Sequence, residues 1–240
     1  MSANVSSIRI GIYGTDGAFA HERHGCGLWP AGYAATLTAA GATPVPLDDL
    51  GSDRRWNDLL DDLHGILISG SEAPTGAETV EGQRLCEWCR KRRLPVLAVD
   101  HGLHILNATY GGNSYQDLPR EFPEGIQHRH PPEKGLRHAI NVEPGTRLAE
   151  IYGEGEVVVN SEHRRAVCKV AKGFRISARA LDGVIEAIET ETASWFALGV
   201  QWHPASATAS GLDIQLFRGL VEACVQRCSE ASRTSRVHAA

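Results

Sequence analysis

Two short segments of the sequence place acid–base side chains directly after an apolar run. Asp100 follows "LPVLAV" and begins "DHG" (100–102), and His203 follows "LGVQW" (198–202). In open α/β sheets, ligands bind at the carboxyl ends of parallel strands, where a tight strand-to-helix turn lifts one side chain toward the ligand. Gly102 lets the chain turn sharply, and backbone N–H groups at the helix start, including that of His101, can stabilise an anion. The pattern predicts a catalytic pair, Asp100 and His203, with an oxyanion contact at His101.

The elements that must position this pair alternate along the first half of the chain. Continuous apolar runs separated by amphipathic helices indicate a parallel sheet with helices on both faces. We therefore expect an α/β fold with a mostly parallel central sheet. The runs predict strands at 8–14, 43–48, 64–70 and 94–100, and helices at 30–42, 77–92 and 102–112.

The second half of the chain changes character. Residues 138–200 contain strand-like segments separated by turns, and residues 210–228 have the pattern of a closing helix. We therefore expect a small antiparallel portion in the C-terminal half. No segment has the composition of a linker, so the sequence predicts a single domain over residues 1–228 and, because the remaining residues are polar, a disordered tail over 229–240.

The composition argues against several classes of partner. The formal net charge is −5, and the Lys and Arg residues are scattered, so nothing indicates a nucleic-acid partner. No run approaches the roughly 18 apolar residues of a membrane span, and the N-terminus lacks the pattern of a secretory signal, which favours a cytoplasmic location. The six cysteines are then expected to be free thiols. The "CEWC" segment (86–89) lies within a helix pattern, where a redox or zinc role is disfavoured.

Five motifs carry a specific resemblance. In order along the chain they are "PVLAVDHG" (95–102), "GGNSYQDL" (111–118), "VNSEHRRAV" (159–167), "ARALDGVIEAIE" (178–189) and "LGVQWHPA" (198–205). They resemble the class I glutamine amidotransferase-like superfamily, most of all its gamma-glutamyl-gamma-aminobutyrate hydrolase branch, peptidase family C26. That branch typically reads "PVLGICRG", "GGTLYQDL", "VNSLHHQAV", "ARAEDGTIEAIE" and "LGVQWHPE". The resemblance implies a class I glutamine amidotransferase-like fold with a flavodoxin-like core.

The resemblance also implies which residues occupy the family's catalytic positions. Carried over by position, the family's Cys nucleophile, its activating His and its Glu become Asp100, His203 and Ala205. The family's oxyanion strand end, "PGG", becomes "SGS" (69–71), which leaves Gly70 to supply a backbone N–H. A carboxylate is a far weaker nucleophile toward amides than a thiolate, so ordinary glutaminase activity is not expected.

Further residues are expected near the site. The resemblance implies that Gln116, Asn160, Ser161 and His163 line the substrate site. Arg164 and Arg165 replace the family's His and Gln, and two guanidinium groups beside a site can clamp a carboxylate or phosphate. The alternative is that both are ordinary surface arginines of a solvated turn. No spacing signature supports a metal site, so we expect neither a metal nor a cofactor.

Three interpretations of Asp100 remain open. In the first, Asp100 acts with His203 as a nucleophile or general base in a hydrolase or an acyl or amide transferase for a glutamyl-like or other anionic small molecule. In the second, the chain is a pseudoenzyme that binds a small ligand or a partner protein. In the third, Asp100 only caps the following helix, which is worth about 1 kcal/mol. A homodimer or a partner enzyme fits any of the three.

Overall fold

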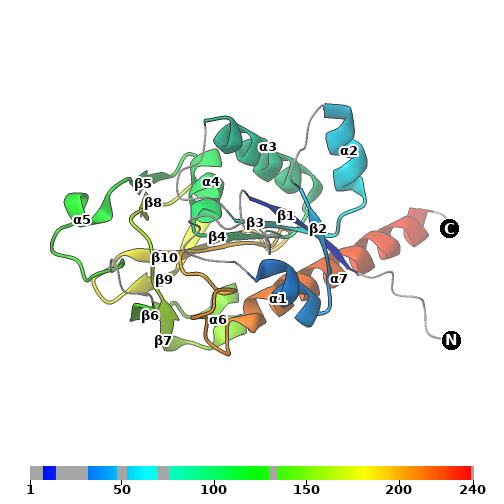
Figure 1. Cartoon of the computed structure of the whole chain (residues 1–240). Helices are drawn as coiled ribbons and strands as arrows, with labels where there is room; N and C mark the ends of the chain where they lie inside the picture. Colours follow the sequence, from blue (N-terminus) through cyan, green and yellow to red (C-terminus); the bar gives the residue numbers. More distant parts are fainter. Residues whose placement is uncertain (1–7, 15–31, 48–52, 70–75, 130–134, 239–240) are drawn as a thin grey trace.

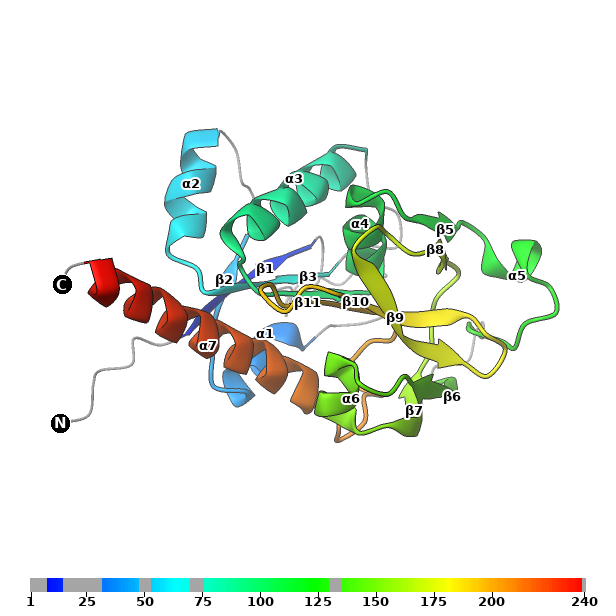
Figure 2. The ribbon, with the colours of Figure 1, turned by 180° about the vertical axis from the view of Figure 1, so that it is seen from behind.

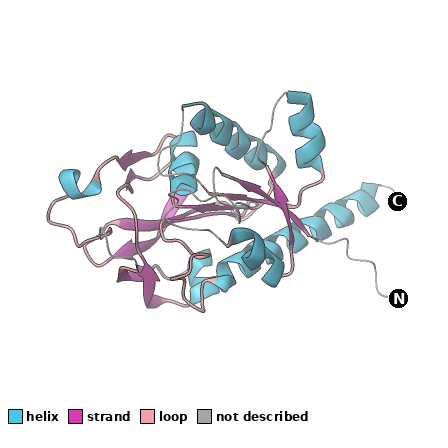
Figure 3. Cartoon of the chain, in the orientation of Figure 1, coloured by secondary structure: helices cyan, strands magenta, loops and turns pink. Residues whose placement is uncertain are grey.

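The computed structural model of the chain describes residues 8–14, 32–47, 53–69, 76–129 and 135–238. Helices and strands alternate through the first half, and strands dominate the second (Figure 1, Figure 3). The helices are α1 (Tyr33–Ala39), α2 (Asp53–Asp61), α3 (Gly76–Arg92), α4 (His101–Thr109), α5 (Leu118–Glu121), α6 (Arg147–Tyr152) and α7 (Ile214–His238). The strands are β1 (Arg9–Tyr13), β2 (Thr43–Pro46), β3 (Gly65–Ile68), β4 (Val96–Val99), β5 (Asn113–Tyr115), β6 (Arg137–Val142), β7 (Gly155–Asn160), β8 (Ala166–Lys169), β9 (Phe174–Ala180), β10 (Ile185–Thr190) and β11 (Ala197–Val200).

The described strands form one 11-stranded sheet with a parallel and an antiparallel half. The parallel half has the order β2-β1-β3-β4-β11, and the antiparallel half continues as β10-β9-β6-β7. Strand β8 pairs with β10, and β5 pairs with β8. These pairings confirm the expected α/β fold with a mixed sheet. The antiparallel part is more extensive than expected because it also takes in β5.

Helices cover both faces of the parallel half, as Figure 2 shows from behind. One face packs against α2, α3 and α4, which contribute buried residues such as Trp56, Leu85 and Leu103. The opposite face packs against α1, α6 and α7, with Leu37 and Phe217 fully buried. This arrangement follows from the continuous apolar strands, because a strand that is buried on both faces needs a helix layer on each side.

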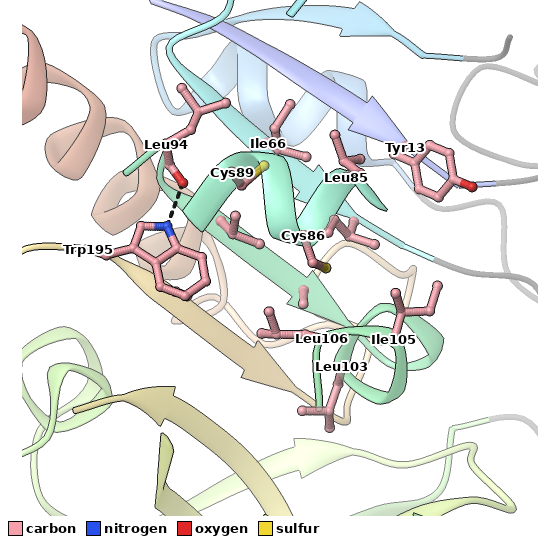
Figure 4. Close-up of a cluster of buried hydrophobic side chains, with 14 of the residues drawn as sticks. Tyr13, Ile66, Leu85, Cys86, Cys89, Leu94, Leu103, Ile105, Leu106 and Trp195 are labelled. Carbon is pink, nitrogen blue, oxygen red and sulfur yellow. Dashed lines mark hydrogen bonds between the residues drawn. The ribbon is translucent and has the colours of Figure 1, made fainter. Parts of the chain in front are cut away.

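The described cysteines and helices bear on two of the expectations from sequence. Its cysteines are free, as expected, and Cys26 lies outside it. Cys86 and Cys89 face the packed interior between α3 and the sheet, where Trp195 donates a hydrogen bond to the Leu94 carbonyl (2.8 Å; Figure 4). Both thiols are fully buried, so Cys86 and Cys89 are core residues, and this burial raises the pKa of the Cys86 thiol to about 12. None of the described helices is long and apolar enough to cross a membrane.

The final helix differs from the prediction. Helix α7 continues to His238, so the predicted disordered tail from residue 229 is wrong for residues 229–238. The hydroxyls of Ser229 and Ser232 donate to the carbonyls of Val225 and Cys228 one turn earlier, both at 2.9 Å. Polar residues of this kind are compatible with an exposed helix, because the helix satisfies their backbone groups internally.

A short helix also occurs where strands were expected. Helix α6 begins after Thr146, whose hydroxyl accepts a hydrogen bond from the Ala149 N–H at 3.0 Å. This N-cap satisfies one of the backbone donors that a helix leaves open at its start. The cap, together with the buried Leu148, explains why "TRLAEIY" (146–152) is helical.

Candidate functional site

Asp100 forms the tight turn between β4 and α4. Its backbone has φ 49° and ψ −108°, in the left-handed region that a residue other than glycine adopts rarely. Its N–H donates to the Val200 carbonyl (2.8 Å), which ties the turn to the end of the neighbouring strand β11. A backbone in this region costs about 1–3 kcal/mol and persists only where the surroundings impose it. The strand–turn–helix arrangement expected at Asp100 is therefore present.

Gly102 makes this turn possible. A Cβ atom at Gly102 would lie 2.1 Å from the Ile68 carbonyl oxygen at the end of β3. No side chain fits at that separation, so a glycine is required for the start of α4 to lie against β3. The contact brings the N-terminus of α4 to the same sheet edge as Ser69, which lies just before the predicted oxyanion residue, Gly70. Gly70 itself lies outside the described residues.

The Asp100 carboxylate is surrounded by polar groups from three other elements. Among the described residues, Gln201 is its hydrogen-bond donor, with Nε2 at 2.7 Å from Oδ1. Burial lowers the pKa of Arg165, and the Asp100 carboxylate opposes that shift. Burial raises the pKa of the Tyr33 hydroxyl, and Asp100 adds to the increase. The Asp100 carboxylate therefore interacts with an amide, a guanidinium group and a phenol.

Arg165 also contacts the first residue of α4. Its Nη1 donates to His101 Nδ1 at 3.2 Å, and because an arginine is always protonated, this ring nitrogen must be the acceptor. His101 is buried, and Arg165 is half-buried. The structure thus brings together Asp100, His101, Arg165 and Gln201, although the sequence did not single out Gln201.

His203 lies at the adjacent strand end, where Asn160 holds its backbone. The Asn160 side chain accepts the His203 N–H and donates to the His203 carbonyl, both at 2.9 Å. Its Nδ2 also donates to Ser206 Oγ at 3.1 Å. These contacts let Asn160 position His203, and a contact of Asn160 with substrate stays a prediction.

Two other predicted substrate contacts, Arg164 and Gln116, are exposed and bonded to neighbouring residues. Arg164 is exposed and forms an ion pair with Asp117 at 3.0 Å, while Arg165 turns inward. The two guanidinium groups therefore have different partners, and a substrate contact by either arginine stays a prediction. Gln116 is also exposed, and its amide donates to the Ser114 carbonyl at 3.0 Å.

The helix-capping interpretation of Asp100 is also corrected. Asp100 stands at the N-cap position of α4, but its side chain makes no capping hydrogen bond. Its carboxylate bonds Gln201 on the neighbouring strand end. With φ at 49°, the backbone is far from the extended conformation in which an N-cap side chain reaches the first helical N–H groups.

His163 and Ser161, which were expected to line the substrate site, belong to a buried cluster. His163 lies with His128, His138 and Glu186, and their candidate ligand atoms are all within 4.8 Å of one another. Ser161 supports the cluster, because its hydroxyl donates to the His128 carbonyl at 2.7 Å. Burial by itself raises the pKa of Glu186, but the surrounding rings, His163 foremost, lower it below its ordinary value.

Sequence reasoning missed most of this cluster. His128 lies between α5 and β6, His138 lies on β6 and Glu186 lies on β10, so no short motif contains them. The histidine-rich segment 127–138 and the "DGVIE" segment (182–186) were the available signals. Their separation in the sequence hides that they meet in the fold.

Comparisons with known proteins identify the family. The Peptidase C26 family model matches residues 80–205. The gamma-glutamyl-gamma-aminobutyrate hydrolase PuuD of Escherichia coli is 30% identical over 84% of this chain and 88% of its own length. A gamma-glutamyl-gamma-aminobutyrate hydrolase of Shigella flexneri is 33% identical over the same shares. The chain belongs to the Peptidase C26 family, within the glutamine amidotransferase-like superfamily.

A solved structure supports the fold assignment. The glutaminase domain of CTPS from Trypanosoma brucei, with bound acivicin, superposes with a TM-score of 0.62. The match covers 92% of this chain and 94% of that one at 16% sequence identity. At this identity the likeness concerns the fold.

Proposed function

We propose that the chain is a hydrolase or an acyl or amide transferase for a glutamyl-like small molecule, in which Asp100 and His203 act in place of the family's Cys–His–Glu triad. The observation that carries the proposal is the left-handed backbone of Asp100, with φ 49°. Such strain clusters at functional sites, because a residue with no role there is readily replaced by one that relieves it. The related hydrolases, by their names, act on a gamma-glutamyl compound.

The chemistry follows from the groups at this sheet edge. Asp100 acts as a general base that removes a proton from water or from an acceptor, and the deprotonated atom attacks the acyl carbon. Protonated His203 gives its proton to the leaving group. Backbone N–H groups at the start of α4 stabilise the oxyanion, and Arg165 attracts the substrate's negative charge. Without a thiolate, the substrate needs a better leaving group than an amine, such as that of an ester, a thioester or an acyl phosphate.

A second candidate is a pseudoenzyme that binds a small anionic ligand without turnover. The contacts of Asp100 favour the pseudoenzyme, because Gln201 donates to its carboxylate and Arg165 interacts with the carboxylate electrostatically. A carboxylate oxygen that already accepts a hydrogen bond is less available to attack a substrate. In this case Ala205, where the family has Glu, marks a second lost catalytic group.

The two candidates are separated by a turnover screen with Asp100→Asn. Wild type is tested with gamma-glutamyl amides, esters, thioesters and acyl phosphates, and the control is Arg164→Gln, which alters an exposed arginine paired with Asp117. We expect turnover of an activated donor and a loss of kcat of about 100-fold or more in Asp100→Asn, with kcat of the control unchanged.

The screen contradicts the proposal if wild type turns over none of the donors and both variants bind an anionic ligand as wild type does. That result establishes the pseudoenzyme. Rapid hydrolysis of glutamine or a gamma-glutamyl amide by wild type would contradict the proposed need for an activated leaving group.

A further inference from the structure

We propose that His128, His138, His163 and Glu186 form a binding site for a divalent transition metal ion, with zinc as the best fit. The proposal is independent of the proposed function, because it involves neither Asp100 nor His203. Four segments meet at this point: the chain between α5 and β6, strand β6, the chain between β7 and β8, and strand β10. All four side chains are buried.

Four of the six spacings between the donor atoms suit a tetrahedral ion, and all six are within 4.8 Å. Glu186 Oε1 lies 3.2 Å from His128 Nδ1, 3.4 Å from His138 Nε2 and 3.3 Å from His163 Nε2. His128 Nδ1 and His138 Nε2 are 3.2 Å apart. Zinc bonds of about 2.0–2.1 Å to nitrogen and oxygen place neighbouring ligands of a tetrahedron roughly 3.3–3.4 Å apart. The four residue types are all ordinary zinc ligands.

Several of these atoms lack the hydrogen bonds that burial demands. His163 Nε2 and both carboxylate oxygens of Glu186 are buried and have no hydrogen-bond partner. The nearest ring nitrogens lie 3.2–3.4 Å from Glu186 Oε1. A buried polar group without a partner costs about 1–3 kcal/mol, and a charged one costs more. A cation among the four side chains would satisfy these atoms together.

The outer contacts of the histidines set their protonation in the way that metal binding requires. His163 Nδ1 donates to the Arg165 carbonyl at 2.8 Å, and His138 Nδ1 donates to the Ala139 carbonyl at 3.2 Å. His128 Nε2 lies 3.0 Å from Asp182 Oδ2. A carbonyl can only accept, so the proton of a neutral ring sits on the outer nitrogen and leaves a lone pair on the inner one. Metal-binding histidines almost always have such an outer partner.

The local structure of β10 aims Glu186 at this point. The pairing of β10 with β9 shifts register between Ile185 and Ala187, so Glu186 lies at an irregularity of the ladder. β-bulges redirect a side chain and are common beside functional sites. The irregularity therefore explains how a carboxylate on a buried strand meets three rings from other segments.

Protons are the alternative occupants of the cluster. A zinc ion would balance the two negative charges of Glu186 and Asp182, and two protonated rings would do the same. A protonated His128 could donate to His138 Nε2 or to Glu186 Oε1, which both lie 3.2 Å from its Nδ1. A metal ion would in addition bind His163 Nε2 and Glu186, whose buried atoms have no well-aligned hydrogen-bond partner, and on this ground we infer the metal.

The ion would stabilise the segments that surround the turn at Asp100. Four protein ligands close the coordination sphere, which is typical of structural zinc. His163 is tied to the Arg165 carbonyl, and the Glu186 carbonyl accepts the Gln201 N–H at 2.8 Å. Arg165 and Gln201 are the residues that surround Asp100, so the metal site would fix the segments that carry them.

The first test measures metal by elemental mass spectrometry in the full-length chain, purified without a polyhistidine tag. We expect about one zinc ion per chain in wild type and a loss of about tenfold or more in Glu186→Gln. Asp182→Asn, which alters the outer partner of His128 and keeps an oxygen that can accept from a backbone N–H, should weaken zinc affinity by about 10–100-fold. The matched control is His64→Gln, because His64 is a histidine that accepts the Arg9 N–H at 3.1 Å away from the cluster; it should keep the metal.

A second measurement keeps the test decisive if a variant fails to fold. Wild type is stripped with a chelator and titrated with Co²⁺, which should give the visible absorption of a tetrahedral ion, and with Zn²⁺, which should raise the Tm. The proposal is overturned if wild type holds less than about a tenth of an ion per chain and shows neither response. The cluster would then hold protons instead of a metal ion. Equal metal in wild type and a folded Glu186→Gln would overturn it as well.

Discussion

Two buried carboxylates on the same strand, Glu186 and Glu189 of β10, have opposite surroundings. Glu189 accepts hydrogen bonds from the Arg175 guanidinium (3.0 and 2.6 Å) and from the N–H groups of Arg147 and Leu148 at the start of α6 (3.0 and 3.2 Å). Glu186 is equally buried, yet neither of its oxygens accepts a hydrogen bond. One carboxylate is fully satisfied by fixed donors, and the other faces three imidazole rings.

The donors around each carboxylate distinguish a structural acid from a ligand-binding one. Arginine and backbone N–H groups can only donate, so they need an acceptor and leave no room for an ion. Imidazole nitrogens can accept instead, and here their outer contacts turn lone pairs toward Glu186. A buried carboxylate among lone pairs is unfavourable without a cation.

The largest expected effect comes from removing the metal. A chelator should lower the Tm of wild type by about 10 °C, which corresponds to about 4 kcal/mol at saturation a thousandfold above Kd. It should lower the Tm of Glu189→Gln by a similar amount but leave that of Glu186→Gln unchanged. Differential scanning calorimetry with and without the chelator measures this contrast. Equal chelator effects in the two variants would mean that the two carboxylates do not differ in the way described.

The next effect concerns Glu189 alone. Glu189→Ala leaves Arg175 and the start of α6 without their acceptor, and we expect the free energy of unfolding to fall by about 3 kcal/mol. Urea denaturation measures the loss, with Glu191→Ala as a control because Glu191 is an exposed acid just beyond the same strand. A loss in the Glu189 variant no larger than that in the control would show that fixed donors do not make a buried carboxylate structural.

The smallest effect isolates the helix end that Glu189 shares with Thr146. Thr146→Ala removes the hydroxyl that accepts the Ala149 N–H, and we expect a loss of about 1 kcal/mol. Urea denaturation of this variant and of Thr146→Ser, which keeps the hydroxyl, gives the comparison. If Thr146→Ser loses as much stability as Thr146→Ala, the cap does not contribute and Glu189 alone holds the start of α6.

Much of the fold could be predicted because it follows local patterns. The apolar runs at 8–14, 64–70 and 94–100 correspond to β1, β3 and β4, and the amphipathic run at 77–92 corresponds to α3. Helix α6 was missed because its formation depends on a cap and on Glu189, which lies far along the chain. The length of α7 was missed because polarity was taken as a sign of disorder, although an exposed helix is polar too.

The candidate site was predicted less completely than the fold. The turn at Asp100 follows from its apolar strand and from Gly102, which are adjacent in the sequence. The directions of Arg164 and Arg165 do not follow from the same reasoning, because both are arginines in one motif and only the path of the chain separates them. Asn160 and His163 lie in the expected motif, and their contacts give them further roles.

The α/β architecture, the family and the sharp turn that carries Asp100 follow from the sequence, because each depends on residues that are close along the chain. The groups that surround that carboxylate and the side chains that join His163 are set by tertiary contacts. The cluster of His128, His138, His163 and Glu186 draws on four segments of the chain. Sheet pairing and burial bring these segments together, and no spacing within the sequence encodes the distances between their side chains.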